Sequence, residues 1–264
     1  MSDTNLSALD EEAAELIEAL TVPKRRARPR LAAPLREAGE QDIATPAGPV
    51  RAWRLGRGPA VLLIHGWDDD NCLWAPLIER FQERARAVVA LDLPGHGFSE
   101  AADPSSGAAA AAVRTVADAL GPIDAIVGHS FGCLVGIRAL AEGLEARRIA
   151  CIATPIPTPE QRWARARRAG VPEPVIARAA ELFAARAETM EPPYDVAGVA
   201  PAMTAAALFL HSDDDEQCPV GNAETLRKLW PGAKLALADG LGHRLIAQDP
   251  SMLARVVSFV EAAG

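Results

Sequence analysis

Short apolar runs alternate with helix-like stretches along most of the chain from about Ile43 onward. Several runs are apolar at every position, which is typical of strands buried on both faces. Strands that alternate with helical segments predict a parallel sheet with crossover helices. The expected strands are Val50–Leu55, Ala60–Ile64, Ala87–Leu91, Ala125–Val127, Arg148–Ile152, Ala206–Leu210 and Lys234–Ala238. The chain is therefore expected to be an α/β protein, with a mostly parallel central sheet covered by helices on both faces.

Helical periodicity fills the stretches between these runs. The expected helices are Leu73–Arg84, Ala108–Leu120, Phe131–Glu142, Ala223–Trp230 and Ser251–Ala262. The last of them has the clearest start, because Asp249 suits an N-cap and Pro250 suits the first helical position. An apolar stripe then predicts the buried side of that helix: Leu253, Val256, Val257 and Val260.

The alternation breaks between Thr154 and Met203, where clustered prolines separate Ala-, Arg- and Glu-rich helical stretches. This pattern predicts a small helical lid over residues 154–205, inserted between two parts of one core, 41–153 and 206–264. Residues 1–40 are expected to form a peripheral extension with an amphipathic helix and a basic linker. Within that linker, the basic stretch from Lys24 to Arg30 is interpreted as a solvated segment, with a docking arm as the alternative.

Charge and cysteine usage narrow the class of protein. The formal net charge of −8 argues against nucleic-acid binding, since phosphate backbones require a basic surface. The four cysteines are widely spaced and show no metal-ligand pattern, so neither a disulfide framework nor a metal site is expected. No secretory signal or transmembrane segment is visible, and a cytoplasmic protein is expected.

The sharpest local motif is Gly128-His129-Ser130-Phe131-Gly132, between an apolar run and a helical stretch. A nucleophile on a tight strand-to-helix turn needs small neighbours, because larger side chains would clash there. The turn also places Ser130 at a helix N-terminus, which favours developing negative charge. The alternative is an ordinary glycine-rich turn.

A serine nucleophile needs a base, and an acid that orients the base. His243 follows the last expected strand, so it should lie at the carboxyl edge of the sheet, where ligands bind in open α/β folds. The acid is less certain from the residues alone. Three consecutive aspartates, Asp213 to Asp215, follow the strand Ala206–Leu210, and Asp239 lies four residues before His243.

From about Ile43 to the C-terminus the chain resembles the α/β-hydrolase superfamily, specifically its lid-bearing esterases and related acyl hydrolases. Four separated segments carry the resemblance, together with the order serine, acid, histidine. They are Leu63-Ile64-His65-Gly66-Trp67, Asp92-Leu93-Pro94-Gly95-His96-Gly97-Phe98-Ser99, the Ser130 turn, and Gly240-Leu241-Gly242-His243.

The resemblance also selects the acid. The family's acid segment commonly reads HGxxDxxVP, and His211 to Pro219 fits that frame with Asp215 in the catalytic place, although Ser212 and Cys218 depart from it. The resemblance further implies an oxyanion hole made by the backbone N–H groups of Trp67 and Phe131. The candidate substrate-pocket residues are His65, His129, Trp163, Phe183, Met190 and Tyr194, with packing or structural roles as the alternatives for them.

The expected function is a serine hydrolase that cleaves a carboxylic ester of a small to medium, largely apolar acyl substrate. Thioester, lactone and C–C bond hydrolysis use the same triad and stay open. A different class, a non-catalytic hydrolase-like binding protein, is disfavoured because every required residue is present. No cofactor or metal is implied, and the chain is expected to be a monomer or a homodimer.

Overall fold

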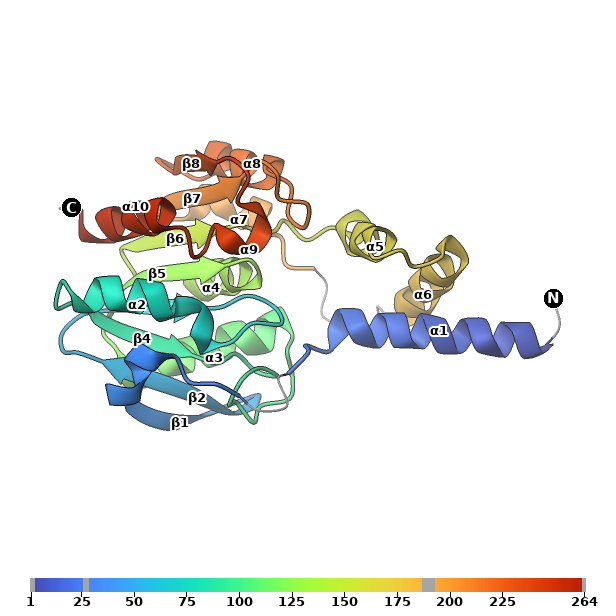
Figure 1. The fold of residues 1–264 in the computed structure, drawn as a ribbon, viewed down its shortest axis with the longest axis horizontal. Coiled ribbons are helices and arrows are strands. Elements are labelled where there is room, and N and C mark those ends of the chain that lie inside the picture. Colours follow the sequence, from blue (N-terminus) through green and yellow to red (C-terminus); the bar gives the residue numbers. More distant parts are fainter. Residues whose placement is uncertain (1–2, 26–28, 187–192, 263–264) are drawn as a thin grey trace. The chain divides into compact units, whose positions relative to one another are not determined.

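Within the described residues, eight strands form one continuous sheet (Figure 1). The computed structural model describes residues 3–25, 29–186 and 193–262. The strands lie in the order β1-β2-β4-β3-β5-β6-β7-β8. The two pairs that involve β2 are antiparallel and all the others are parallel. Their bounds are β1 Gly39–Thr45, β2 Gly48–Leu55, β3 Ala60–Ile64, β4 Ala87–Leu91, β5 Ile123–His129, β6 Arg148–Ile152, β7 Ala206–Ser212 and β8 Lys234–Ala238. The structure confirms the expected α/β fold.

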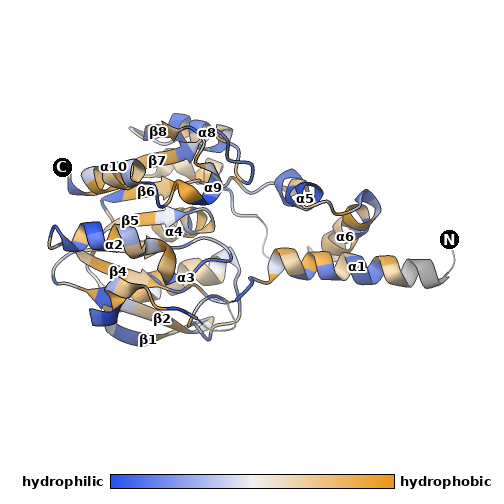
Figure 2. Ribbon diagram, viewed as in Figure 1, coloured by the Kyte–Doolittle hydropathy of each residue, from blue (hydrophilic) through white to orange (hydrophobic). Residues whose placement is uncertain are grey.

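Helices cover both faces of this sheet. Helices α2 (Ala75–Gln82) and α10 (Pro250–Glu261) contribute to the same hydrophobic cluster as one face of the strands, and both lie in front of the sheet in Figure 1. The opposite face carries α3 (Ser106–Leu120), α4 (Phe131–Ala141) and α8 (Gly221–Leu229). Strands β3, β4 and β6 are consequently buried at every residue. Figure 2 shows hydrophobic residues along the strands of the sheet. This double cover explains the uninterrupted apolar runs in the sequence.

Strand β1 was not expected from the sequence, because it lacks an apolar run. It is one of the two outer strands of the sheet and pairs only with β2, and Ile43 is its single buried residue. Arg51 of β2 reaches across to Asp42, with Nε 2.6 Å from Oδ1. Charged side chains on an edge strand discourage pairing with other chains. The polar sequence of β1 therefore reflects its place at the edge.

The chain divides into two compact units, and the division differs from the expected boundaries. Residues 1–24 group with 157–194, while 25–156 group with 195–264. The expected N-terminal extension is thus split, because helix α1 (Asp3–Thr21) packs against α6 (Glu173–Arg186) in the helical unit, which also contains α5 (Pro159–Arg168). A small core forms there from Ala13, Ile17 and Ala179. This pairing joins segments far apart in sequence, so no local pattern predicts it.

The rest of the expected extension belongs to the α/β unit. Arg25 donates hydrogen bonds to the carbonyl oxygens of Gly97, at 3.1 Å, and Ser99. Further on, Asn71 donates from Nδ2 to the carbonyl of Arg30 at 3.1 Å. Arg25 is exposed, as expected for a solvated segment, and its guanidinium is also bonded to the core. Arg26 and Arg28 lie outside the described residues.

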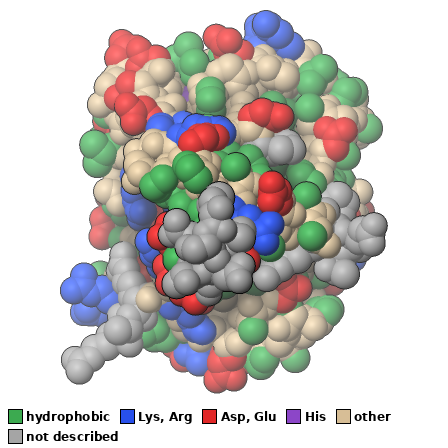
Figure 3. Space-filling view, turned by 90° about the vertical axis from the view of Figure 1, so that its right-hand side faces the viewer, with side chains coloured by type: hydrophobic (Ala, Val, Ile, Leu, Met, Phe, Trp, Pro, Cys, Tyr) green, Lys and Arg blue, Asp and Glu red, His purple; other side chains and the backbone are tan. Residues whose placement is uncertain are grey.

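Charges of both signs are interspersed with apolar side chains on the face shown in Figure 3. No single sign dominates that face. Among the helices that the structure describes, none is both long enough and apolar enough to cross a membrane.

Candidate active site

Ser130 occupies the turn between the end of β5 and the start of α4. Its φ is 51°, in the left-handed region that residues other than glycine seldom adopt. Two backbone hydrogen bonds hold it there, from the Ser130 amide to the carbonyl of Ile152 at 2.8 Å and from the Cys133 amide to the Ser130 carbonyl at 2.9 Å. Such strain persists only where the surroundings enforce it, and it is concentrated at functional sites.

The glycines around Ser130 are required by close backbone contacts. A Cβ on Gly128 would lie 2.7 Å from the carbonyl oxygen of Gly132, and a Cβ on Gly132 would overlap the carbonyl oxygen of Ile64 in β3. Neither neighbour is a flexible side chain that could move away. The sequence argument that this turn needs small residues thus has a direct geometric cause.

His243 lies beside Ser130, although 113 residues separate them in the sequence. It belongs to the short helix α9 (Gly242–Leu245), just after β8. Its Nε2 is 2.9 Å from the Ser130 Oγ, and its Nδ1 is 2.8 Å from Oδ2 of Asp215. Ser130, Asp215 and His243 follow the carboxyl ends of β5, β7 and β8, so the parallel sheet brings them to one edge.

The carboxylate of Asp215 is fully buried and well supplied with hydrogen-bond donors. Its Oδ1 accepts from the amides of Gln217 and Cys218, at 2.9 and 2.8 Å. Burial by itself would raise the pKa of this carboxyl. Hydrogen bonds from His211 and His243, followed by the charge of His243 and the Cys218 amide, outweigh burial and hold the Asp215 pKa well below its ordinary value. Asp215 is therefore a permanent anion behind the imidazole at neutral pH.

The other acids of this region contact the histidine loop through its backbone. Asp214 Oδ1 accepts from the Gly242 amide at 2.8 Å, and Asp213 Oδ1 accepts from the Gly240 amide at 3.3 Å. Ser212 Oγ accepts from the amides of Leu241 and Gly242, at 3.0 and 3.2 Å. The alternative acid Asp239 is exposed to solvent. The geometry thus separates three neighbouring aspartates, one against the imidazole ring and two against the loop that carries it.

Trp67 and Phe131, the expected oxyanion donors, are adjacent. Their rings pack edge to face with centroids 5.3 Å apart and an interplanar angle of 88°. Phe131 is the first residue of α4, and the first amides of a helix have no acceptor within it. Trp67 lies directly after Gly66, in the turn that follows β3.

Of the four other histidines, all buried, His65, His96 and His129 make ring contacts that favour structural roles. His65 Nδ1 is 2.8 Å from the Gly66 carbonyl, and its Nε2 accepts from the Leu93 amide at 2.9 Å. His96 contacts the Pro94 carbonyl through Nδ1 at 2.8 Å. Both ring nitrogens of His65 are therefore occupied by backbone, which leaves none for a substrate. His129 Nε2 is 2.9 Å from the carbonyl oxygen of His243.

Burial is the main cause that lowers the pKa of all three rings. It brings the pKa of His65 to about 4 and those of His96 and His129 to about 3. For His96 the charge of His65 lowers the pKa further, and for His129 the charge of His243 does so. The three imidazoles are consequently neutral at pH 7.

We expect the free energy of unfolding to fall as the pH falls from about 7 to about 4.5. The unfolded chain takes up protons near the ordinary histidine pKa of about 6.5, whereas the folded rings stay neutral, so acid favours the unfolded state. Each ring then contributes a loss of about 2 kcal/mol. Urea unfolding of the wild type and of His96→Gln at both pH values measures this. The variant should lose less stability with acid.

Asp92 works in the opposite direction over part of this range. Burial raises its pKa to about 6, against hydrogen bonds from Phe98 and Asn71 that lower it. The folded state therefore binds a proton there that the unfolded chain lacks between about pH 6 and 4, and gains stability. An acid-induced loss that is identical in the wild type and in His96→Gln would contradict the assignment to the histidines.

The other candidate pocket residues belong to the helical unit or lie beyond the described chain. Trp163 and Phe183 pack edge to face, with centroids 6.1 Å apart, and the Arg162 guanidinium carbon lies 3.9 Å from the centre of the Phe183 ring. These aromatics therefore pack within the helical unit. Tyr194 is half-buried near the end of that unit, and Met190 lies outside the described residues.

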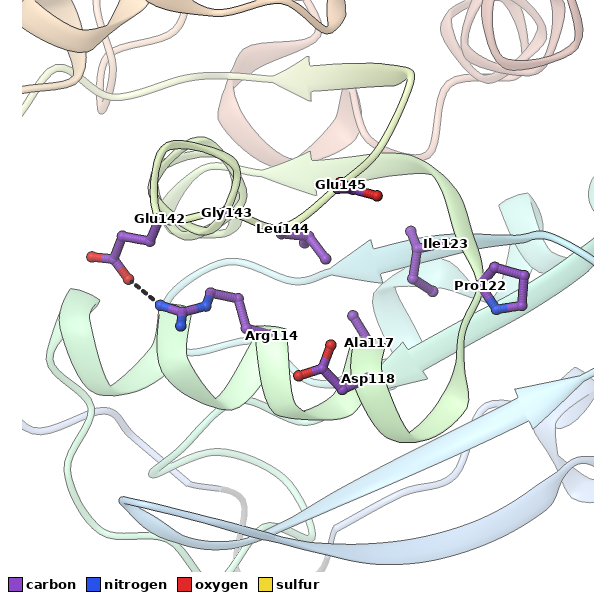
Figure 4. A pocket seen from close by; sticks show the side chains of 9 residues that line it. All are labelled: Arg114, Ala117, Asp118, Pro122, Ile123, Glu142, Gly143, Leu144 and Glu145. Atoms are coloured by element: carbon purple, nitrogen blue, oxygen red, sulfur yellow. Dashed lines mark hydrogen bonds and ion pairs between the residues drawn. The ribbon is translucent and has the colours of Figure 1, made fainter.

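A pocket of about 400 Å³ lies at the amino end of β5, at the other end of this strand from Ser130 (Figure 4). Its walls come from the end of α3, the start of β5 and the turn after α4, and Arg114 pairs with Glu142 across it at 3.0 Å. Because Ser130 follows the far end of β5, this pocket has no part in its chemistry. In the described part of the chain, no three His, Cys, Asp or Glu side chains are arranged to hold a metal ion.

Comparison with known proteins gives one family match and several relatives. Residues 61–257 match the Alpha/beta hydrolase family. A pimeloyl-[acyl-carrier protein] methyl ester esterase of Xanthomonas campestris is 37% identical over 99 residues, which is 38% of each chain. The enzyme of the same name from Methylococcus capsulatus is 37% identical over 116 residues, 41% of this chain and 42% of that one. The matched stretch thus spans about two fifths of these relatives.

Solved structures extend the likeness in fold over more of the chain. An esterase of Pyrococcus furiosus has a TM-score of 0.74 at 20% identity and covers 91% of this chain and 97% of its own. An esterase of Exiguobacterium antarcticum has a TM-score of 0.65 at 17% identity and covers 85% of this chain and 100% of its own. At such identities the likeness shows a shared fold.

Proposed function

The chain belongs to the α/β-hydrolase family, and on that premise we propose that it is a serine hydrolase that cleaves carboxylic esters. The observation that carries the proposal is the unbroken line of hydrogen bonds from Ser130 Oγ through His243 to the buried Asp215, at 2.9 and 2.8 Å. The line starts at a serine whose backbone is held in the left-handed region. An orienting acid, a base and a nucleophile in contact are what acyl transfer requires.

The proposed first half-reaction acylates the serine. His243 Nε2 accepts the Ser130 hydroxyl proton while Oγ attacks the ester carbonyl carbon. The negative charge on the carbonyl oxygen is stabilised by the amides of Trp67 and Phe131, a pair of donors of the kind worth about 3 kcal/mol each. When the tetrahedral intermediate collapses, the C–O bond to the alcohol breaks, and the alcohol leaves with the proton from His243.

The second half-reaction releases the acid. A water molecule gives a proton to His243 Nε2 and attacks the acyl carbonyl, and the bond to Ser130 Oγ then breaks as the proton returns to Oγ. Throughout the cycle Asp215 keeps Nδ1 of the imidazole protonated, so that Nε2 faces the serine as an acceptor. The residues exchange only protons and one acyl group, and this cycle requires no further group.

The proposed substrate is a small to medium, largely apolar acyl ester. The names of the curated relatives add methyl esters of an acyl chain to the substrates worth testing. The lid role of residues 154–205, with Trp163, Phe183, Met190 and Tyr194 lining a pocket, stays a prediction. The cytoplasmic location and the oligomeric state also stay predictions.

A panel of substrates tests the proposal. p-Nitrophenyl esters from acetate to laurate, methyl esters of medium-chain acids, an acyl thioester and a lactone would be compared at equal concentration, beside labelling by a fluorophosphonate. We expect ester hydrolysis and a single covalent label on Ser130. If the labelled protein prefers the thioester or the lactone, that bond would take the place of the carboxylic ester in the proposed function. Folded protein with neither hydrolysis nor label would favour a binding protein.

A further inference from the structure

Two segments of the candidate active site are joined by an ion pair that no pattern in the sequence predicts. Arg244 immediately follows His243, and its guanidinium bonds to Oδ1 of Asp69, two residues after Trp67. The Asp69 side chain is 5% exposed, whereas that of Arg244 is 55% exposed. A buried carboxylate paired with a guanidinium at the surface resists separation, since the acid would be left in a poorly solvated place.

Asp69 belongs to a tight turn that also contains Trp67. Its amide donates to the Gly66 carbonyl at 3.3 Å, and Asp68 within the turn has φ of 60°. This hydrogen bond closes the turn around Trp67. The backbone of the turn therefore sets the direction of the Trp67 amide. Any force on the Asp69 carboxylate acts on this turn.

His129 contacts the same two segments. Its Nε2 is 2.9 Å from the carbonyl oxygen of His243, and its Nδ1 is 3.7 Å from Oδ2 of Asp69. A carbonyl can only accept, and the ring is neutral because burial lowers its pKa, so the single ring proton lies on Nε2. Nδ1 then presents a lone pair toward Asp69, and no hydrogen bond between them balances that carboxylate.

The guanidinium of Arg244 supplies a charge opposite to that of the Asp69 carboxylate. It bonds to Oδ1 of Asp69, whereas the His129 ring faces Oδ2. At the same time it belongs to α9, the helix that carries His243. The pair is therefore a direct link between the turn of the oxyanion donor and the helix of the base.

We propose that Asp69 and Arg244 are positioning residues, whose ion pair holds the Trp67 turn and the His243 helix in the relative placement that ester cleavage requires. The inference rests on the proposed function and names a role for this pair within the same site. Neither residue contacts the reacting atoms. Their effect is on the distances between Ser130, the base and the oxyanion donor, and small misplacements of such groups slow an enzyme strongly.

Four variants and one control test the pair. Arg244→Gln and Asp69→Asn each remove one charge, and the double variant removes both, while Arg244→Lys keeps the positive charge. Arg147→Gln is the matched control, because Arg147 is 64% exposed and pairs at 2.5 Å with Asp124, which is 8% exposed, at the opposite end of β5. For each protein we would measure kcat, KM, the rate of Ser130 labelling by a fluorophosphonate, and the melting temperature.

We expect Arg244→Gln and Asp69→Asn each to lower kcat and the labelling rate by about 10-fold to 100-fold, with KM changed by less than about threefold. Because both remove one link, the double variant should be about as slow as the slower single variant. Arg244→Lys should recover most of the rate. Arg147→Gln should keep wild-type kcat even where its melting temperature falls.

The outcomes separate this inference from the proposed function. A labelled, active wild type with an equally fast Arg244→Gln variant would overturn the positioning role alone. So would rate losses that multiply in the double variant, or an equal loss of kcat in Arg147→Gln. Absence of Ser130 labelling in the folded wild type would overturn the proposed function, and this inference with it.

Discussion

Replacing Ser130 with alanine is expected to lower kcat for p-nitrophenyl ester hydrolysis by about 10⁴-fold to 10⁶-fold while the protein stays folded. The variant loses the atom that we propose forms the acyl bond, the Oγ that lies 2.9 Å from His243 Nε2. Alanine fits the space of the serine, and the backbone contacts of the turn do not involve Oγ. Steady-state kinetics and fluorophosphonate labelling measure the loss.

A second serine provides the control for this variant. Ser258 is an exposed residue of α10, and Ser258→Ala should keep wild-type activity and the covalent label. Ser130→Ala should bind substrate without turning it over, because the amides of Trp67 and Phe131 remain. Ester hydrolysis at a tenth or more of the wild-type rate in Ser130→Ala would show that another group is the nucleophile.

Most of the fold could be predicted because its signals are local. The strands buried on both faces, such as β3 and β4, are apolar at every position, and the sequence showed them within a residue or two. The start of α10 could be predicted equally well, since Asp249 caps it by accepting from the amides of Ser251 and Met252 at 2.9 and 3.0 Å. Each of these features depends on residues that are neighbours in the chain.

The features that escaped prediction depend on contacts between distant segments. Strand β1 has the composition of a loop, and only its pairing with β2 makes it a strand. The packing of α1 on α6 likewise joins two helices more than 150 residues apart. The Asp69–Arg244 pair joins the turn after β3 to the short helix α9, and neither residue belongs to a periodic pattern in the sequence. Secondary-structure propensity and residue spacing contain no information about contacts between segments that are distant in the sequence.

The orienting acid of the proposed triad could be predicted only in part. The residues alone left Asp213, Asp214, Asp215 and Asp239 open, and the resemblance to a family favoured Asp215. The structure adds the physical reason, since the backbone after β7 turns only the third aspartate under the imidazole and gives the first two to the amides of the histidine loop. Substitution of the three neighbours is therefore a sharp test of the site.

We expect Asp215→Asn to lower kcat by about 10³-fold to 10⁴-fold, although it changes a single atom. Oδ1 of Asp215 accepts from the amides of Gln217 and Cys218, so the oxygen of an asparagine will occupy that side. Its NH₂ group must then face His243 Nδ1. Because an amide nitrogen donates, Nδ1 has to become the acceptor, and the ring proton moves to Nε2, where the base can no longer receive the proton of Ser130.

Asp213→Asn and Asp214→Asn are the matched controls, because each keeps the oxygen that its loop amide needs. Asp214 bonds to the Gly242 amide and Asp213 to the Gly240 amide, and neither contacts the imidazole. Both variants should therefore lose less than about tenfold in kcat, a loss limited to loop placement. Kinetics on the three purified variants, with melting temperatures to exclude unfolding, decide the matter. If Asp214→Asn were the slow variant and Asp215→Asn retained activity, the orienting acid would be Asp214, and the hydrogen bond from His243 to Asp215 would be only structural.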